Sequence, residues 1–238
     1  MSEHISKQFD AELEAVRTRV LQMGGLVEAQ IVSAMDGLAS GKTELIEAVI
    51  GGDHRVNAME VELDESCSQI IAKRQPAASD LRLIIAIIKT ITDLERIGDE
   101  AEKIGRMAKL IHEAQRQNMP NLEMRHVADL AIGMLRKALD AFARLDSSAA
   151  SAVVRQDELV DNEFRSILRQ LITFMMEDPR TITRSLEILF VAKALERIGD
   201  HSKNMAEYVV YMVEGRDVRH IRDNTASNAA SVDPLAAS

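Results

Sequence analysis

The hexapeptide LERIGD occurs twice in the chain, at 94–99 and again at 195–200. The two copies lie about 100 residues apart, so the second half of the sequence repeats the first. Each copy contains a Glu and an Asp in an i,i+4 relation, which places both acids on one face if the segment is helical. An internal repeat of this length predicts two similar structural units in tandem.

The composition favours helices over strands. Aromatic residues make up only 3% of the chain, with 11 Gly and 4 Pro, whereas strands favour aromatic residues and tight turns need Gly and Pro. The chain is rich instead in strong helix formers such as Ala, Leu and Glu. From Phe9 to Leu38, apolar residues recur every three or four positions, as expected of a bundle helix. The sequence therefore predicts an all-α fold.

Sparse breaks containing Gly, Pro or Ser divide each half into three helical patterns. We expect helices over 5–39, 43–73, 77–116, 121–145, 149–176 and 179–215. Pro179 after Asp178 is typical of the first turn of a helix behind its N-cap. The pattern predicts two tandem three-helix bundles, 1–117 and 118–216. We expect the small polar tail at 217–238 to be disordered.

The charge and the apolar runs restrict the classes of partner. The net charge is −9 and no basic face is evident, so we expect no nucleic-acid partner. The first residues do not resemble a signal peptide, and the most apolar run, 83–88, is too short to span a bilayer. The single Cys67 cannot form an internal disulfide, which fits a reducing compartment. We therefore expect a cytoplasmic protein without direct membrane insertion.

The repeated acids of the first half have partners on the preceding helix. Two helices joined by a short turn lie antiparallel, so residues equally far from the turn lie at the same height. Counting from the turn at Pro76 places Asp53 level with Asp99 and Asn57 level with Glu95. On a helical wheel these residues continue the apolar stripe and do not lie opposite it.

The second half repeats this arrangement. Counting from the turn at 178–179 places Asp157 level with Asp200 and Asp161 level with Glu196. Asp157 and Asp161 also continue the apolar stripe of their helix. The sequence thus predicts one group of facing polar side chains beside the core of each bundle.

Carboxylates clustered near a core must be protonated, paired with a cationic side chain or bound to a metal. Arg96 and Arg197 project about 100° away from the neighbouring Glu on their helices, and Arg96 is better placed for Glu100. Hard divalent or trivalent cations take oxygen ligands, and i,i+4 acids on facing helices can bridge them. The pattern therefore favours a metal site in each half.

The candidate metal ligands are Asp53, Asn57, Glu95 and Asp99 in the first half, and Asp157, Asp161, Glu196 and Asp200 in the second. Asn57 stands where the second half has an acid, which predicts a first site that is either weaker or completed by Glu60 or Glu102. Two plainer interpretations stay open. The acids could form a solvated helix face, and Asp53, which follows two glycines, could only cap a helix.

Two LERIGD copies, each closing a three-helix repeat, resemble the PhoU family of phosphate-uptake regulators. The resemblance extends from 4–17 through 71–84 and 140–146 to 213–220. The family's paired acids fall here on Glu95 with Asp99, Glu196 with Asp200, and Asp157 with Asp161. Asp53 with Asn57 departs from that pattern.

The resemblance implies two symmetric bundles with clusters of iron, zinc, manganese or magnesium on their surface. It also implies a non-enzymatic adaptor that represses the phosphate-starvation response and restrains phosphate uptake. Such an adaptor couples the ATP-binding subunit of the phosphate ABC transporter to a phosphate-sensing histidine kinase, and lies at the inner membrane through these partners.

Two further expectations concern assembly and chemistry. A homodimer is expected because an amphipathic helix with two apolar sides needs cover. The alternative function is a metal-dependent, carboxylate-bridged hydrolase or oxidase. It would require open coordination positions on the metal and a proton donor nearby. Because the sequence shows no clear proton donor, we expect no catalytic residues.

Overall fold

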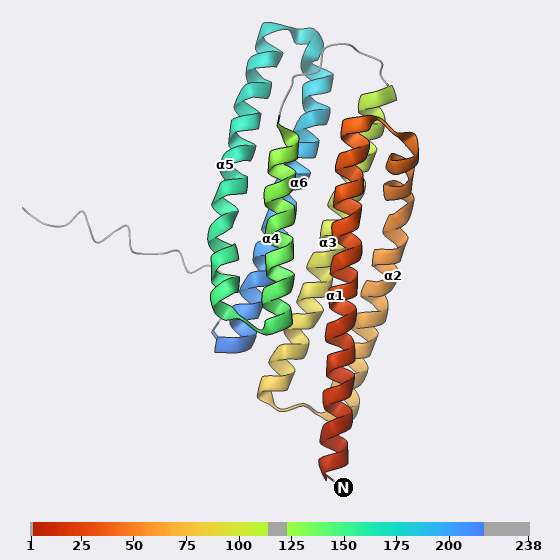
Figure 1. The fold of residues 1–238 in the computed structure, drawn as a ribbon, viewed down its shortest axis with the longest axis vertical. Helices are drawn as coiled ribbons and strands as arrows, with labels where there is room; N and C mark the ends of the chain where they lie inside the picture. The colour runs from red at the N-terminus through yellow and green to blue at the C-terminus, as the bar shows by residue number, and fades with distance from the viewer. Residues whose placement is uncertain (1, 114–122, 217–238) are drawn as a thin grey trace, which may run out of the picture.

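The computed structural model of the protein describes residues 2–113 and 123–216, and in these residues it contains helices and no strand (Figure 1). The first half forms α1 (Ser2–Ser40), α2 (Thr43–Arg74) and α3 (Ala78–Glu113). The second forms α4 (Met124–Arg144), α5 (Ser147–Glu177), the 3-10 turn η1 (Pro179–Thr181) and α6 (Ile182–Glu214). The prediction of an all-α fold with three long helices per half is confirmed. Within the described ranges, no helix is both long and apolar enough to cross a membrane.

The helix ends agree with the sequence breaks to within a few residues. α1 ends just before Gly41, whose φ of 69° is a conformation that glycine adopts without strain. Asp146 caps α5, which begins at Ser147, two residues before the start predicted at 149. Pro179 follows its N-cap Asp178 as predicted, although it starts a 3-10 turn that leads into α6. The predicted boundary at 117/118 and the predicted tail at 217–238 lie outside the described residues.

The two bundles are joined through their third helices. α3 packs along α6, α1 touches α4, and the apolar side chains of both halves form one contiguous core. Asp93 contacts His201, whereas Ile111, further along α3, accepts a hydrogen bond from Arg184, further back along α6. α3 and α6 are therefore antiparallel (Figure 1), and an approximate two-fold axis relates the halves.

The contact between α3 and α6 contains buried charged side chains. Glu100 is 4% exposed and its carboxylate lies 2.6 Å from the guanidinium of Arg197. Asp93 is 5% exposed and lies 2.7 Å from Nδ1 of His201. The sequence-based pairing of Glu100 with Arg96 is not what the structure shows. Glu100 binds an arginine of the other half, because α6 passes directly over its face of α3.

We predict that Asp93→Ala lowers the free energy of unfolding by about 2 kcal/mol. The change removes the acceptor of His201 Nδ1 and of the Asn204 amide, 3.3 Å away, and an unsatisfied buried donor costs about 1–3 kcal/mol. Urea denaturation followed by circular dichroism measures the difference. Asp140→Ala is the control, because it breaks an exposed pair with Arg144 that contributes about 0.5 kcal/mol or less. Equal losses in both variants would contradict the prediction.

Candidate metal centres

Three acids of the second bundle meet between α5 and α6. Carboxylate oxygens of Asp157, Asp161 and Asp200 lie within 4.8 Å of one another. Asp157 is 7% exposed, and the other two are half-buried. Among the described residues, no other set of three acidic, His or Cys side chains satisfies this spacing. Three oxygens from two facing helices at this separation can bind one hard cation.

Burial and the neighbouring acids both disfavour the ionised form of Asp200. Burial raises its pKa to about 6, and the negative charges of Glu196 and Asp157 act in the same direction. Glu196, the fourth predicted ligand, lies beside the three acids, but both its oxygens contact Lys193 Nζ, at 2.5 and 2.6 Å. The structure thus brings three of the four predicted ligands together and directs the fourth at a lysine.

Two further basic side chains reach this cluster, and sequence reasoning did not predict either. Lys203 Nζ lies 2.6 Å from Asp157 Oδ2, and Arg165 Nη2 lies 3.3 Å from Asp161 Oδ2. Arg165 lies four residues from Asp161 on α5, and Lys193 lies three residues from Glu196 on α6. Both spacings bring side chains together on one helix and can be read from the sequence. Lys203 reaches from α6 to α5, so the i,i+4 pattern could not have revealed its partner.

In the first bundle, the predicted ligands lie close enough to perturb one another. Burial raises the pKa of Asp53, Glu95 and Asp99. The charge of Asp99 also raises the pKa of Glu95. The charge of Asp53 raises the pKa of Asp99, although Asp99 is the exposed member of the group. Asn57 donates from Nδ2 to Asp53 Oδ2 at 2.8 Å. Because Asp53 lies well inside α2, its interpretation as a helix N-cap is wrong.

Two more acids belong to the first cluster, as the sequence had suggested. The charge of Glu102 raises the pKa of both Asp53 and Asp99. The charge of Glu60 raises the pKa of Glu95. The replacement of an acid by asparagine at position 57 is therefore offset by acids elsewhere in the same group.

The basic residues of the second cluster are replaced in the first. Aligning the repeated motifs equates Lys193, Lys203 and Arg165 with Thr92, Glu102 and Val61, respectively. Arg106 lies 2.6 Å from Glu102 and neutralises that carboxylate from outside. The first cluster therefore carries more uncompensated negative charge than the second, and its acids depend more on protons or on an external cation.

Both clusters offer oxygen donors, the type that hard cations bind, but among the described residues only the second gathers three acids within 4.8 Å. In the first bundle, Asp53 Oδ1 and Asn57 Oδ1 are buried oxygens without a hydrogen-bond donor. Carboxylate and amide oxygens suit magnesium and manganese in particular. Such an ion would neutralise the carboxylates and tie α2 to α3, or α5 to α6. The residues present can supply its ligands.

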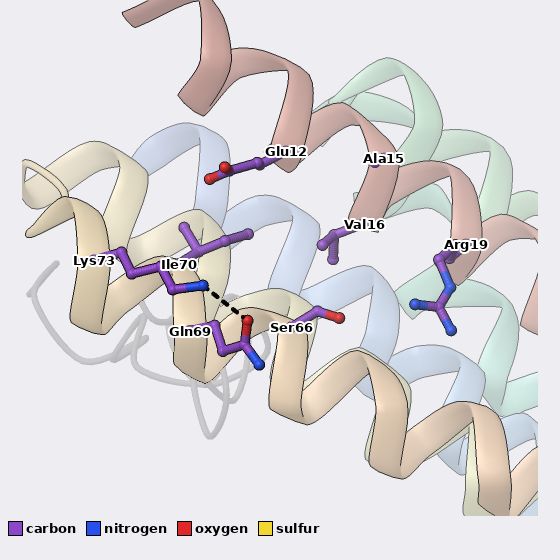
Figure 2. Close-up of a pocket in the computed structure, with 8 residues that line it drawn as sticks. All are labelled: Glu12, Ala15, Val16, Arg19, Ser66, Gln69, Ile70 and Lys73. Carbon is purple, nitrogen blue, oxygen red and sulfur yellow. Dashed lines mark hydrogen bonds between the residues drawn. The ribbon is translucent and has the colours of Figure 1, made fainter. Parts of the chain in front are cut away.

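A groove between α1 and α2 lies apart from these clusters (Figure 2). Its lining residues are Glu12, Ala15, Val16, Arg19, Ser66, Gln69, Ile70 and Lys73. Its one carboxylate, Glu12, lies 2.6 Å from Arg74, and the Ser66 hydroxyl donates to the Glu62 carbonyl oxygen at 2.7 Å. The groove therefore offers no facing carboxylates of the kind that a carboxylate-bridged hydrolase or oxidase requires.

Comparison with protein-family models identifies the family of the chain. The PhoU domain matches it twice, over residues 20–108 in the first bundle and 124–209 in the second. The chain belongs to the PhoU family. It is 50% identical over 221 residues to the phosphate-specific transport system accessory protein PhoU homolog of Pseudomonas aeruginosa, covering 93% of this chain and 91% of that one. It is 49% identical over 222 residues to the PhoU accessory protein of Escherichia coli K12, with the same coverage.

Solved structures of the family share the fold. The crystal structure of PhoU from Pseudomonas aeruginosa matches with a TM-score of 0.84 at 48% identity, covering 87% of this chain and 100% of that one. The phosphate transport system regulatory protein PhoU from Streptococcus pneumoniae matches with a TM-score of 0.81 at 30% identity, covering 88% and 99%. The family resemblance and the doubled three-helix fold predicted from the sequence are confirmed.

We predict that Asp200→Asn stabilises the metal-free protein at pH 7. A folded-state pKa near 6, above the ordinary value of 3.8, means that the ionised carboxylate destabilises the fold. This destabilisation grows between about pH 4 and 6, so the variant should be more stable by roughly 1–2 kcal/mol at pH 7 and equal to wild type near pH 4. Chemical denaturation in EDTA across this pH range measures the effect.

Manganese should reverse the order of stability. We expect wild type to bind an ion that Asp200→Asn binds more weakly, so added Mn²⁺ should stabilise wild type more than the variant and make it the more stable of the two. Asp129→Asn, a change of an exposed acid on α4, is the control. It should alter neither the stability of the metal-free protein nor the stabilisation by Mn²⁺. A pH-independent difference between wild type and Asp200→Asn would contradict the prediction.

Proposed function

We propose that this protein is a cytoplasmic regulatory adaptor of phosphate homeostasis. In this role it represses the phosphate-starvation response and restrains phosphate uptake when phosphate is plentiful. The main support is the names of its relatives. Proteins that share about half of their residues with this chain, over about nine tenths of both chains, are named accessory proteins of phosphate-specific transport. Those names give no support to the alternative of a hydrolase or oxidase, and we propose a protein without enzymatic activity.

The proposed partners are the ATP-binding subunit of the phosphate ABC transporter and a phosphate-sensing histidine kinase. Through them the adaptor would reside at the inner face of the membrane without entering it. Six long helices in the described residues present extended faces on which two such partners could dock. The names of the relatives, which place them in the transport system, favour the transporter as the first partner to test.

The proposed cofactors are hard metal ions, with magnesium and manganese favoured over iron and zinc by the oxygen donors. The supporting geometry is the meeting of Asp157, Asp161 and Asp200 in one bundle and the donor-free oxygens of Asp53 and Asn57 in the other. Ions at these positions would hold paired helices together and preserve the docking faces.

We also propose a homodimer. Six exposed apolar side chains lie near the α5–α6 turn: Ile172, Phe174, Met176, Ile182, Leu186 and Phe190. Ile182, Leu186 and Phe190 follow one another at intervals of four residues and share one face of α6, and Ile172 and Met176 share one face of α5. Clusters of this kind on a soluble protein mark interaction surfaces.

We expect Leu186→Asp to convert a dimer to a monomer, because it places a charge in the proposed interface while its side chain is already 40% exposed in the single chain. Size-exclusion chromatography with light scattering measures the mass. Val61→Asp, at an exposed position of α2, is the matched control. A wild-type chain that is monomeric at high concentration would contradict the proposal.

The regulatory role predicts the phenotype of a deletion. A reporter under a phosphate-starvation promoter should stay active in high phosphate when the gene is deleted, and the full chain should restore repression. Asp161→Asn combined with Asp200→Asn should restore it less, because the second bundle loses two of its three clustered ligands. Asp129→Asn should restore it fully.

The possible results separate the parts of the proposal. Normal repression in the deletion strain would reject the regulatory role. Full complementation by the double variant would reject only the requirement for an ion in the second bundle. Co-purification of the ATP-binding subunit with the full chain tests the partner directly.

A further inference from the structure

Gln30 on α1 is a buried polar side chain that sequence analysis did not single out. It is 8% exposed and its amide lies between two glycines of neighbouring helices. A Cβ on Gly52 of α2 would lie 3.4 Å from its Nε2, and a Cβ on Gly98 of α3 would lie 3.6 Å from its Oε1. Both distances are ordinary van der Waals contacts, so the amide packs against the two glycines.

The carbonyl oxygen of Gln30 is buried without a hydrogen-bond donor, beside the part of the first acid cluster that contains Asp53. The position that a Cβ on Gly98 would occupy also lies 3.5 Å from Asp53 Oδ1. Oδ1 of Asn57, on the next turn of α2 and bonded to Asp53 through its Nδ2, is likewise buried and without a donor. Three acceptor oxygens from two helices are thus buried with no hydrogen to accept. Each would destabilise the fold by about 1–3 kcal/mol if nothing bound it.

The second bundle lacks this inner group of oxygens. The offset of 104 residues that equates Asp53 with Asp157 also equates Gln30 with Met134, which is 2% exposed and apolar. Gly52 is replaced by Gln156, whose Oε1 accepts from Lys137 at 3.0 Å. The three nearest neighbours of a Cβ on Gly199 would be carbons of Val160. The amide oxygen that enters the cluster is therefore a property of the first bundle.

We propose that Gln30 supplies a carbonyl ligand, with Asp53 and Asn57, to a hard divalent cation held inside the first bundle. The inference rests on the proposed cation binding and adds a ligand from the third helix of the bundle. One carboxylate and two amide oxygens form an oxygen-only set that suits Mg²⁺ or Mn²⁺. Gln30 would thus add α1 to the helices that the ion ties together, whereas the acids of the second bundle lie only on α5 and α6.

The test uses Mn²⁺ and the full chain carrying Asp161→Asn and Asp200→Asn, so that the first bundle dominates binding. Calorimetric titration, with electron paramagnetic resonance of the bound ion, measures the affinity. Adding Gln30→Met, which installs the residue of the second bundle, should weaken Mn²⁺ binding at least about tenfold. Gln156→Met is the matched control and should leave it unchanged.

A second readout separates a ligand from a structural residue. Gln30→Met replaces an amide oxygen that lacks a donor by an apolar group of similar length, so the metal-free protein should be as stable as its parent or more stable. Gln30→Glu keeps an oxygen at the position and should retain Mn²⁺ binding. Opposite effects of Gln30→Met on stability and on affinity are the expected signature.

Three outcomes would overturn the proposal. Unchanged Mn²⁺ affinity in Gln30→Met, with reduced stability of the metal-free protein, would mean that the Gln30 amide donates its N–H to Asp53. Loss of binding in both Gln30→Met and Gln30→Glu would make the residue structural only. If the parent itself binds no Mn²⁺, cation binding in the first bundle fails and Gln30 has no ion to hold, while the regulatory role is tested separately by the deletion.

Discussion

Carboxylates held beside an apolar core by antiparallel helices must have their charge balanced, and much of this structure follows from that requirement. The helical hairpins bring acids of two helices to one level, where burial already raises the pKa of Asp200, Asp53 and Glu95. The energy of this arrangement depends on what stands opposite the acids: a proton, a basic side chain or an ion. A fold that maintains such groups in both halves is suited to respond to cations.

The two halves meet the requirement differently, although the backbone repeats. In the second bundle, Lys193, Lys203 and Arg165 balance part of the charge from within the protein. In the first, an acid and two uncharged residues occupy those positions, and buried amide oxygens face the carboxylates. Gene duplication would explain the shared backbone, but the side chains have diverged in how much of the acids' charge they balance. Treating both sites as copies of one another would miss this difference.

Local pattern was enough to predict the helices, their order and the level at which the acids meet. Those features depend only on the helical period and on the symmetry of a hairpin about its turn. The pairs Glu100–Arg197 and Asp93–His201 could not be predicted in this way, because they depend on where α6 crosses α3. Gln30 was missed for a related reason. Its position on an otherwise apolar face of α1 gains meaning only when the glycines of α2 and α3 are placed beside it.

The continuous apolar interior shared by the two halves has a thermodynamic consequence. Because α3 and α6 belong to the same core, neither repeat can lose its packing without exposing apolar surface of the other. The proposed ion binding in either half would then be linked to the unfolding of the whole chain, and would contribute about 2.7 kcal/mol at a free ion concentration one hundred times the dissociation constant. The availability of a small inorganic ion would thus determine the persistence of a surface tens of ångströms long.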